Sequence, residues 1–212
     1  MRPRRVAMIV MGAAIVAFAA CRDPESSPFS KYERAGVSRT ATPSSTPPIL
    51  STVPEFSFTD ESGKPFGRTQ LAGKPWIANF IFTRCPTICP VFTAKMADVQ
   101  TRVKAGTRPV HLVSFSVDPA HDTPAVLAAY AKQHGADPAT WTFLTGDGEA
   151  IRSAVVEGLK VAAQPVGKDD DLASIFHGSH FVLVDAEGRI RGYYDSADAD
   201  ATDRLLADLA RL

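Results

Sequence analysis

The hydrophobic positions along the chain predict a strand that leads directly into a helix bearing two cysteines. An apolar run extends over Trp76–Phe82, which is typical of a strand that is covered on both faces. The run is followed by Cys85-Pro86-Thr87-Ile88-Cys89-Pro90, after which the pattern becomes helical. Because proline has no N–H, it suits the first turn of a helix, where that group would have no partner. We therefore expect Pro86 in the first turn, with Cys85 at or near the cap and Cys89 on the same face.

Alternating and periodic apolar residues predict the remaining elements. Alternation at residues 55–59, followed by the turn sequence Asp60-Glu61-Ser62-Gly63-Lys64, predicts an opening hairpin. The later patterns predict strands at Val110–Val117, Trp141–Thr145, Phe181–Val184 and Arg189–Tyr194, and helices at Ala125–His134, after Asp147 and at the C-terminal end. This order is that of an α/β, thioredoxin-like fold. We expect a central mixed sheet flanked by helices, with a parallel central pair and an N-terminal β-hairpin extension.

Composition divides the 212 residues into a leader, a linker and one domain. Net charge is zero, with 45% hydrophobic and 22% charged residues, which suits a globular core and gives no basic face for nucleic acid. Residues 1–20 have the pattern of a signal peptide, because three arginines precede an apolar run too short to span a bilayer. Residues 21–50 lack apolar periodicity and predict a disordered tether. The domain is then expected at residues 51–212.

The end of the leader, Phe18-Ala19-Ala20-Cys21, resembles a bacterial lipoprotein box. In this interpretation Cys21 carries lipid and becomes the mature N-terminus. The alternative is a short uncleaved anchor helix with an incidental cysteine. Both interpretations predict an exported domain, tethered to a membrane at the periplasmic or outer side of a bacterial inner membrane. Mass spectrometry of the mature N-terminus distinguishes them.

The number of cysteines limits the kinds of site that the domain can contain. Of the three cysteines, only Cys85 and Cys89 remain as thiols if Cys21 carries lipid. An exported domain with one close pair holds either a local disulfide or a metal site. A bridge across so short a loop restricts the unfolded chain little, which disfavours a purely structural disulfide. We expect the positive end of the helix to favour thiolate at both sulfurs, the form that exchanges disulfides and binds soft metals.

A histidine is the natural candidate for a third ligand, and the chain offers His111, His121, His134, His177 and His180. A single histidine is more often a satisfied polar residue than a ligand. His134 lies near a helix end and needs no other role, and His111 begins a strand. His177 and His180 flank the start of a strand, where positions three apart point to opposite faces. At most one of these two should meet the cysteines, and spacing alone does not choose between them.

A second polar motif, Asp118-Pro119-Ala120-His121-Asp122-Thr123-Pro124, follows the second central strand. A capping threonine and a first-turn proline account for Thr123 and Pro124. They account less well for Asp118 and Asp122. Two alternatives stay open for these carboxylates: they orient the site, or they contact a partner protein.

These motifs carry a family resemblance. Thr83-Arg84-Cys85-Pro86-Thr87-Ile88-Cys89-Pro90 resembles the cysteine motif of the Sco/SenC proteins, thioredoxin-fold copper-binding factors for respiratory oxidase assembly. Three residues separate the cysteines, where thioredoxin-type oxidoreductases have two. Asp118–Pro124 resembles the family's second signature, Asp-Pro-x-x-Asp-Thr-Pro, and the resemblance spans Phe56–Leu212. The family places its ligand histidine where His177 stands relative to Gly188 and has no ligand at the position of His180. The hydroxyl residue that usually follows the histidine is Gly178 here.

The resemblance implies a metal site formed by Cys85, Cys89 and His177. Two thiolates and an imidazole suit Cu(I) and also accommodate Cu(II), whereas structural zinc usually takes four ligands. The implied function is copper delivery to, or maturation of, the dinuclear copper centre of a cytochrome c oxidase. The implied partner is its copper-bearing subunit, with other copper chaperones or thiol oxidoreductases as further candidates.

The competing interpretation is an enzyme, a thiol-disulfide reductase that uses Cys85 and Cys89 as a redox pair on an exported acceptor. A reductase needs no histidine at position 177, so copper titration of a His177→Ala variant discriminates between the two. A peroxiredoxin-like peroxidase is disfavoured, because no Pro-x-x-x-Thr-x-x-Cys arrangement leads to Cys85.

Overall fold

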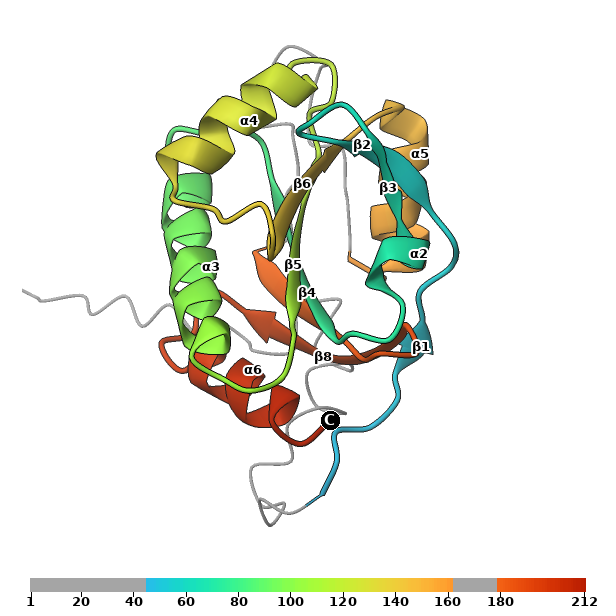
Figure 1. The fold of residues 1–212 in the computed structure, drawn as a ribbon, viewed down its shortest axis with the longest axis vertical. Coiled ribbons are helices and arrows are strands. Elements are labelled where there is room, and N and C mark those ends of the chain that lie inside the picture. The colour runs from blue at the N-terminus through green and yellow to red at the C-terminus, as the bar shows by residue number, and fades with distance from the viewer. Residues whose placement is uncertain (1–44, 162–178) are drawn as a thin grey trace, which may run out of the picture.

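The computed structural model describes residues 45–161 and 179–212. The described strands form one eight-stranded sheet in the order β1-β8-β7-β4-β5-β6-β2-β3 (Figure 1). Their bounds are Ser51–Thr52 (β1), Ser57–Asp60 (β2), Pro65–Gly67 (β3), Trp76–Ile81 (β4), His111–Ser116 (β5), Trp141–Thr145 (β6), His180–Val184 (β7) and Arg189–Asp195 (β8). Strands β4, β5 and β6 run parallel, and the other neighbours pair antiparallel. The predicted mixed sheet, parallel central pair and opening hairpin are confirmed.

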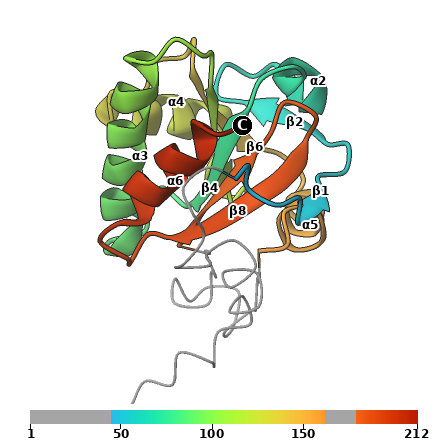
Figure 2. The same cartoon turned by 90° about the horizontal axis from the view of Figure 1, so that it is seen from below.

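Helices cover both faces of the sheet. Figures 1 and 2 show α3, α4 and α6 on one face and α2 and α5 on the other. The bounds of these helices are Arg68–Leu71 (α2), Ile88–Lys104 (α3), Pro124–Gln133 (α4), Gly148–Ser153 (α5, continued by a π-helical turn at Ala154–Gly158) and Ala201–Leu209 (α6). Each face has its own buried apolar cluster, one under α3, α4 and α6 and the other under α2 and α5.

Strand β4 is the centre of this arrangement. Its side chains alternate between the two apolar clusters, with Ile77 and Ile81 on the α3 side and Trp76, Ala78 and Phe80 on the other. Every residue of β4 is buried. The strand covered on both faces that the apolar run predicted is therefore confirmed, and its carboxyl end fixes where the cysteines begin.

The helix that follows β4 begins later than predicted. We expected Pro86 in its first turn, but α3 begins at Ile88, with Thr87 as N-cap. The N–H of Cys85 donates to the carbonyl of Phe82 at 3.2 Å, and this bond closes a turn between strand and helix. Pro90 takes the place in the first helical turn where a missing N–H breaks no intrahelical bond. Cys89 thus lies within the helix and Cys85 in the turn before it.

Side-chain caps begin two other helices as the sequence predicted. The hydroxyl of Thr123 accepts a hydrogen bond from the Val126 N–H at 3.4 Å, and the Asp147 carboxylate accepts one from the Ala150 N–H at 2.9 Å. Two short elements were not predicted: the two-residue strand β1 and the one-turn helix α2. Neither is long enough to show a periodic apolar pattern.

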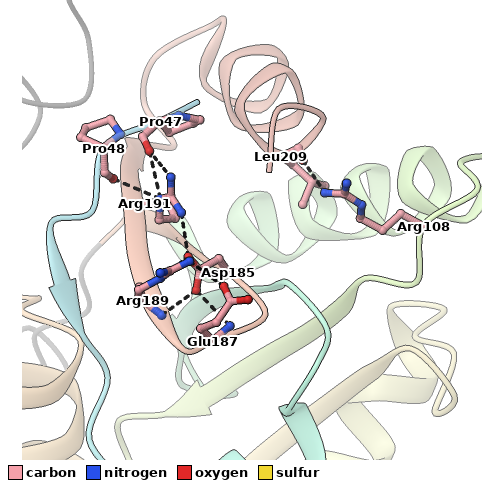
Figure 3. Close-up of polar contacts among 8 residues, drawn as sticks. All are labelled: Pro47, Pro48, Arg108, Asp185, Glu187, Arg189, Arg191 and Leu209. Atoms are coloured by element: carbon pink, nitrogen blue, oxygen red, sulfur yellow. Dashed lines mark hydrogen bonds and ion pairs between the residues drawn. The ribbon is translucent and has the colours of Figure 1, made fainter. Parts of the chain in front are cut away.

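The first described residues lie along β8 and are held by a buried arginine. The Arg191 guanidinium contacts the carbonyls of Pro47 and Pro48, with Nε 3.0 and 3.2 Å from the two oxygens (Figure 3). Its Nη1 donates to the Asp185 carboxylate at 2.7 Å. Further along, the Leu50 N–H donates to the Ile190 carbonyl at 2.8 Å. In this way the chain is attached to the sheet before β1 begins.

Several predictions fall on residues that the structure does not describe. They are the leader at residues 1–20, the lipidation of Cys21, the tether as far as residue 44, and the third ligand His177. Among the helices that the structure does describe, none has the length and apolar character needed to cross a membrane.

Candidate metal centre

Cys85 and Cys89 meet at the carboxyl end of β4, the end of a parallel strand where α/β proteins commonly place their ligand sites. Cys85 lies in the turn after the strand and Cys89 in the first turn of α3. Both are free thiols. Cys85 is 6% exposed and Cys89 is 1% exposed, and both belong to the apolar cluster beneath α3. A reagent or metal ion that approaches from solvent therefore meets Cys85 before Cys89.

The sulfur of Cys85 lies at the amide end of α3. The Cys89 N–H donates to Cys85 Sγ at 3.5 Å, and the Thr87 hydroxyl lies 4.0 Å from the same sulfur. Burial is the largest influence and raises the pKa of the Cys85 thiol. Hydrogen bonds from the backbone of Cys89, Thr87 and Ile88 and from the Cys89 side chain together outweigh burial and leave this pKa below its usual value. The predicted effect of the helix end is confirmed for this sulfur.

The same prediction is wrong for Cys89. Burial above all, together with the nearby Cys85 sulfur and Asp122 carboxylate, raises the pKa of its thiol to about 12. An N–H from the backbone of Phe82 opposes this rise without cancelling it. The physical reason is position: Cys89 lies inside the first turn with its side chain in the core, whereas the helix amides converge on Cys85. The two sulfurs are therefore chemically unequal.

The second polar motif packs directly against the residues that precede Cys85. The Asp122 carboxylate accepts hydrogen bonds from the Thr83 N–H at 3.1 Å and from the Thr83 hydroxyl at 2.6 Å. The Asp118 carboxylate pairs with Arg84, with 2.6 Å between Oδ2 and Nε. Both aspartates are buried, at 0% and 7% exposure respectively. The structure thus brings Asp118 and Asp122 to the cysteine loop.

The histidines are spread widely over the described part of the chain. His111 is buried between β5 and β6, with Nε2 2.9 Å from the Thr142 hydroxyl, and its pKa is lowered to about 4 by burial and by Lys74. His134 forms the C-cap of α4, and His121 is exposed on the aspartate loop. His180 opens β7 and is 8% exposed. Within the described ranges, no three His, Cys, Asp or Glu side chains form a group that could hold a metal ion.

His177 lies outside the described residues, but the strand that follows it is well placed. Strand β7 runs antiparallel to β4, with Val184 opposite Trp76 and Val182 opposite Ala78. The first residues of β7 are therefore at the end of the sheet where β4 delivers the cysteines. The rings of Phe92 and Phe181 pack with centroids 4.7 Å apart and join the cysteine helix to the start of β7.

Sequence reasoning gave no role to three residues that complete this site. Thr83 and Arg84 bind the two aspartates, and Ser116 donates to Asp122 from its hydroxyl at 2.7 Å. The available signal was the polar alternation of Ser114 and Ser116 within a buried strand. This alternation does not identify Ser116 by itself, because Ser114 shows the same pattern and its hydroxyl donates to Asn79 rather than to an aspartate of the site.

A thioredoxin-like fold with two buried free thiols at the carboxyl end of its central strand defines a thiol-bearing α/β protein. Comparison with known families makes the assignment specific, since the SCO1/SenC family model matches residues 45–212. The chain belongs to the SCO1/SenC family, and the predicted family resemblance is confirmed.

Solved structures of the same family are similar to this chain. A SCO1/SenC family lipoprotein from Bacillus anthracis str. Ames has a TM-score of 0.70 and 34% identity, covering 76% of this chain and 95% of that one. BsSco, a member of the Sco family of cytochrome c oxidase assembly proteins with a disulfide switch, has a TM-score of 0.68 and 33% identity, covering 79% and 95%. Copper-bound ScoI of Bradyrhizobium japonicum has a TM-score of 0.62 and 27% identity, covering 76% and 100%. The thioredoxin-like fold class is thereby confirmed.

Proposed function

We propose that this chain is a metallochaperone that binds copper through Cys85, Cys89 and His177 and delivers it to, or matures, the dinuclear copper centre of a cytochrome c oxidase. The observation that carries the proposal is the pair of free, buried thiols at the carboxyl end of β4. Two similar proteins support the proposal. BsSco belongs to a family of cytochrome c oxidase assembly proteins, and the structure of Bradyrhizobium japonicum ScoI was solved with copper bound.

The donor set fits copper on chemical grounds. Thiolate sulfur is a soft ligand that selects Cu(I), and an added imidazole also accommodates Cu(II). The high pKa of Cys89 does not oppose this, because a coordinating metal deprotonates a thiol outright. Binding should therefore release protons, and copper retention should weaken as the pH falls. The position of β7 beside β4 supports His177 as the third ligand, because His177 precedes that strand by three residues.

We propose further that the domain is exported and held at the periplasmic or outer face of the inner membrane by lipid on Cys21. The tether is the part of the predicted linker that precedes Pro47, because Pro47, Pro48 and Leu50 are bonded to Arg191 and Ile190. The similar Bacillus anthracis protein is a lipoprotein, which supports this part. A tether raises the effective concentration of the domain near a membrane-bound acceptor. Mass spectrometry of the mature N-terminus tests it, and an unmodified Cys21 within an intact leader would contradict it.

A second candidate function is thiol-disulfide reduction of an exported acceptor, and the inequality of the two sulfurs favours it. Cys85 has the lowered pKa and the greater exposure of an attacking thiol, whereas Cys89 is buried behind it like a resolving thiol. Carrier and reductase would use the same pair, so His177 separates them.

The decisive experiment is a copper competition titration on the mature chain with a chelator of known affinity, using His177→Ala and His180→Ala. His180 is the matched control, because it lies three residues away, in β7 itself, and is not a predicted ligand. The carrier proposal expects weaker copper binding in His177→Ala and little change in His180→Ala. Unchanged copper affinity in His177→Ala, with full reduction of a model disulfide, would favour the reductase instead.

A further inference from the structure

The Asp122 carboxylate is a buried charge that accepts hydrogen bonds from Thr83 and Ser116. It is 0% exposed. Thr83 supplies both its N–H and its hydroxyl, at 3.1 and 2.6 Å, and Ser116 supplies its hydroxyl at 2.7 Å. A buried carboxylate is costly unless such donors compensate for the lost water. A helix cap does not account for it, because the Thr123 side chain already caps α4.

Asp118 completes a closed network with the same neighbours. Its carboxylate pairs with Arg84 Nε at 2.6 Å, and its N–H donates to the Ser116 hydroxyl at 3.1 Å. Ser116 therefore accepts from the backbone of Asp118 while it donates to the carboxylate of Asp122. The Asp122 N–H returns to the Asp118 carbonyl at 2.9 Å. The loop between β5 and α4 is thereby fastened to the two residues that directly precede Cys85.

This arrangement decides between the two roles that the sequence left open for the aspartates. A carboxylate that contacts a partner protein must be accessible, and both of these are buried and bonded internally. What they hold is the backbone at Thr83 and the side chain of Arg84. Cys85 follows at once, and its sulfur must be in place to receive the Cys89 N–H.

We propose that Asp122 and Asp118 are positioning residues for Cys85, which brace residues 83–84 so that the Cys85 sulfur stays next to the amide end of α3 and close to Cys89. We call this set of contacts from Asp118 and Asp122 to residues 83–84 the brace. Its role rests on the proposed function, since a copper carrier needs its two sulfurs pre-arranged. It does not require copper, and it applies equally to the dithiol chemistry of the pair.

The test measures how fast the two sulfurs find one another without metal. An aromatic disulfide added to the reduced mature chain first transfers one aromatic thiol to Cys85 and releases one aromatic thiolate. Cys89 then attacks the Cys85 sulfur, forms the internal disulfide and releases a second thiolate. The rate of this second release depends on the placement of the two sulfurs.

The key variant is Thr83→Val, which removes one donor to Asp122 without changing any charge. We expect closure to slow by roughly tenfold, the value of one hydrogen bond to a charged group. Thr83→Ser keeps the hydroxyl and should restore the wild-type rate. Asp118→Asn, which weakens the link to Arg84, should slow closure less than Thr83→Val.

Asp208→Asn is the matched control for general loss of stability. Asp208 is also a buried carboxylate, bonded to the Tyr194 hydroxyl at 2.6 Å in α6. It should lower the melting temperature and leave closure unchanged. The brace is overturned if Thr83→Val closes as fast as wild type, or if Asp208→Asn slows closure as much as Thr83→Val does. If the wild-type chain bound no copper but the closure rates were as expected, the copper proposal would be overturned and the brace would still hold.

Discussion

The backbone N–H of Cys89 donates to the sulfur of Cys85 across 3.5 Å. One cysteine of the pair thus stabilises the thiolate of the other. The relationship is not reciprocal, because the Cys89 side chain points into the core beneath α3. Any chemistry that begins with a thiolate therefore begins at Cys85.

The first prediction concerns the order in which the thiols react. In the single variants Cys89→Ser and Cys85→Ser, the remaining thiol is Cys85 or Cys89 respectively. At neutral pH we expect Cys85 to be alkylated by iodoacetamide at least about tenfold faster, because its pKa is lowered while that of Cys89 is raised to about 12. Mass spectrometry of quenched time points measures both rates. Both variants should react equally in denaturant, and equal rates in the folded state would contradict the prediction.

The second prediction concerns acid stability and rests on His111. Burial lowers its pKa from 6.5 to about 4, and the nearby charge of Lys74 acts in the same direction. The unfolded chain then binds a proton that the folded chain rejects once the pH falls below the unfolded pKa of 6.5. This contribution to stability is fully present above that pKa and is lost as the pH falls towards 4. The loss amounts to about 3 kcal/mol at most.

Urea unfolding at a series of pH values across that window measures the effect. His111→Gln removes the titrating group, and we expect its free energy of unfolding to vary less with pH than that of the wild-type chain. His121→Gln serves as control, because this histidine is exposed and its replacement should leave the pH profile unchanged. Identical slopes for His111→Gln and wild type would rule out His111 as the source.

The third prediction concerns the buried hydroxyl pair behind the cysteine helix. Thr93 Oγ1 lies 2.7 Å from the Tyr130 hydroxyl, between α3 and α4. Tyr130→Phe should cost about 1 to 2 kcal/mol of unfolding free energy, because it leaves a buried hydroxyl without its partner. Adding Thr93→Val removes that orphan, so the double variant should lose less than the sum of the two single changes. Strict additivity in a double-mutant cycle would show that the pair does not interact.

The sequence alone predicted the framework better than the details of the site. The run Trp76–Phe82 located the central strand, because a strand buried on both faces is apolar at nearly every position, here all but Asn79. The start of α3 was misplaced, because the turn at Cys85 uses a backbone bond to Phe82 that no residue pattern announces. The bonds from Thr83 to Asp122 join positions 39 residues apart. Such contacts come from tertiary packing, which local patterns do not encode.

The last prediction concerns Arg191, whose side chain is 8% exposed and whose guanidinium joins Asp185 to the carbonyls of Pro47 and Pro48. Arg191→Met should cost about 3 to 5 kcal/mol, since it leaves the buried Asp185 carboxylate with weaker compensation. It should also speed amide hydrogen exchange at Leu50, whose N–H bonds to β8 beside this contact. Urea unfolding and exchange mass spectrometry measure the two effects.

Arg189→Met is the matched control for this prediction. Arg189 binds the same Asp185 oxygen at 2.8 Å, but its side chain is 36% exposed and its other partner is the exposed Glu187. A solvent-exposed pair of this kind contributes about 1 kcal/mol or less. If Arg189→Met destabilised the chain as much as Arg191→Met, any cation beside Asp185 would suffice, and the special role of Arg191 would be contradicted. If only Arg191→Met exposes Leu50 to exchange, the guanidinium itself fastens the entering chain to the sheet.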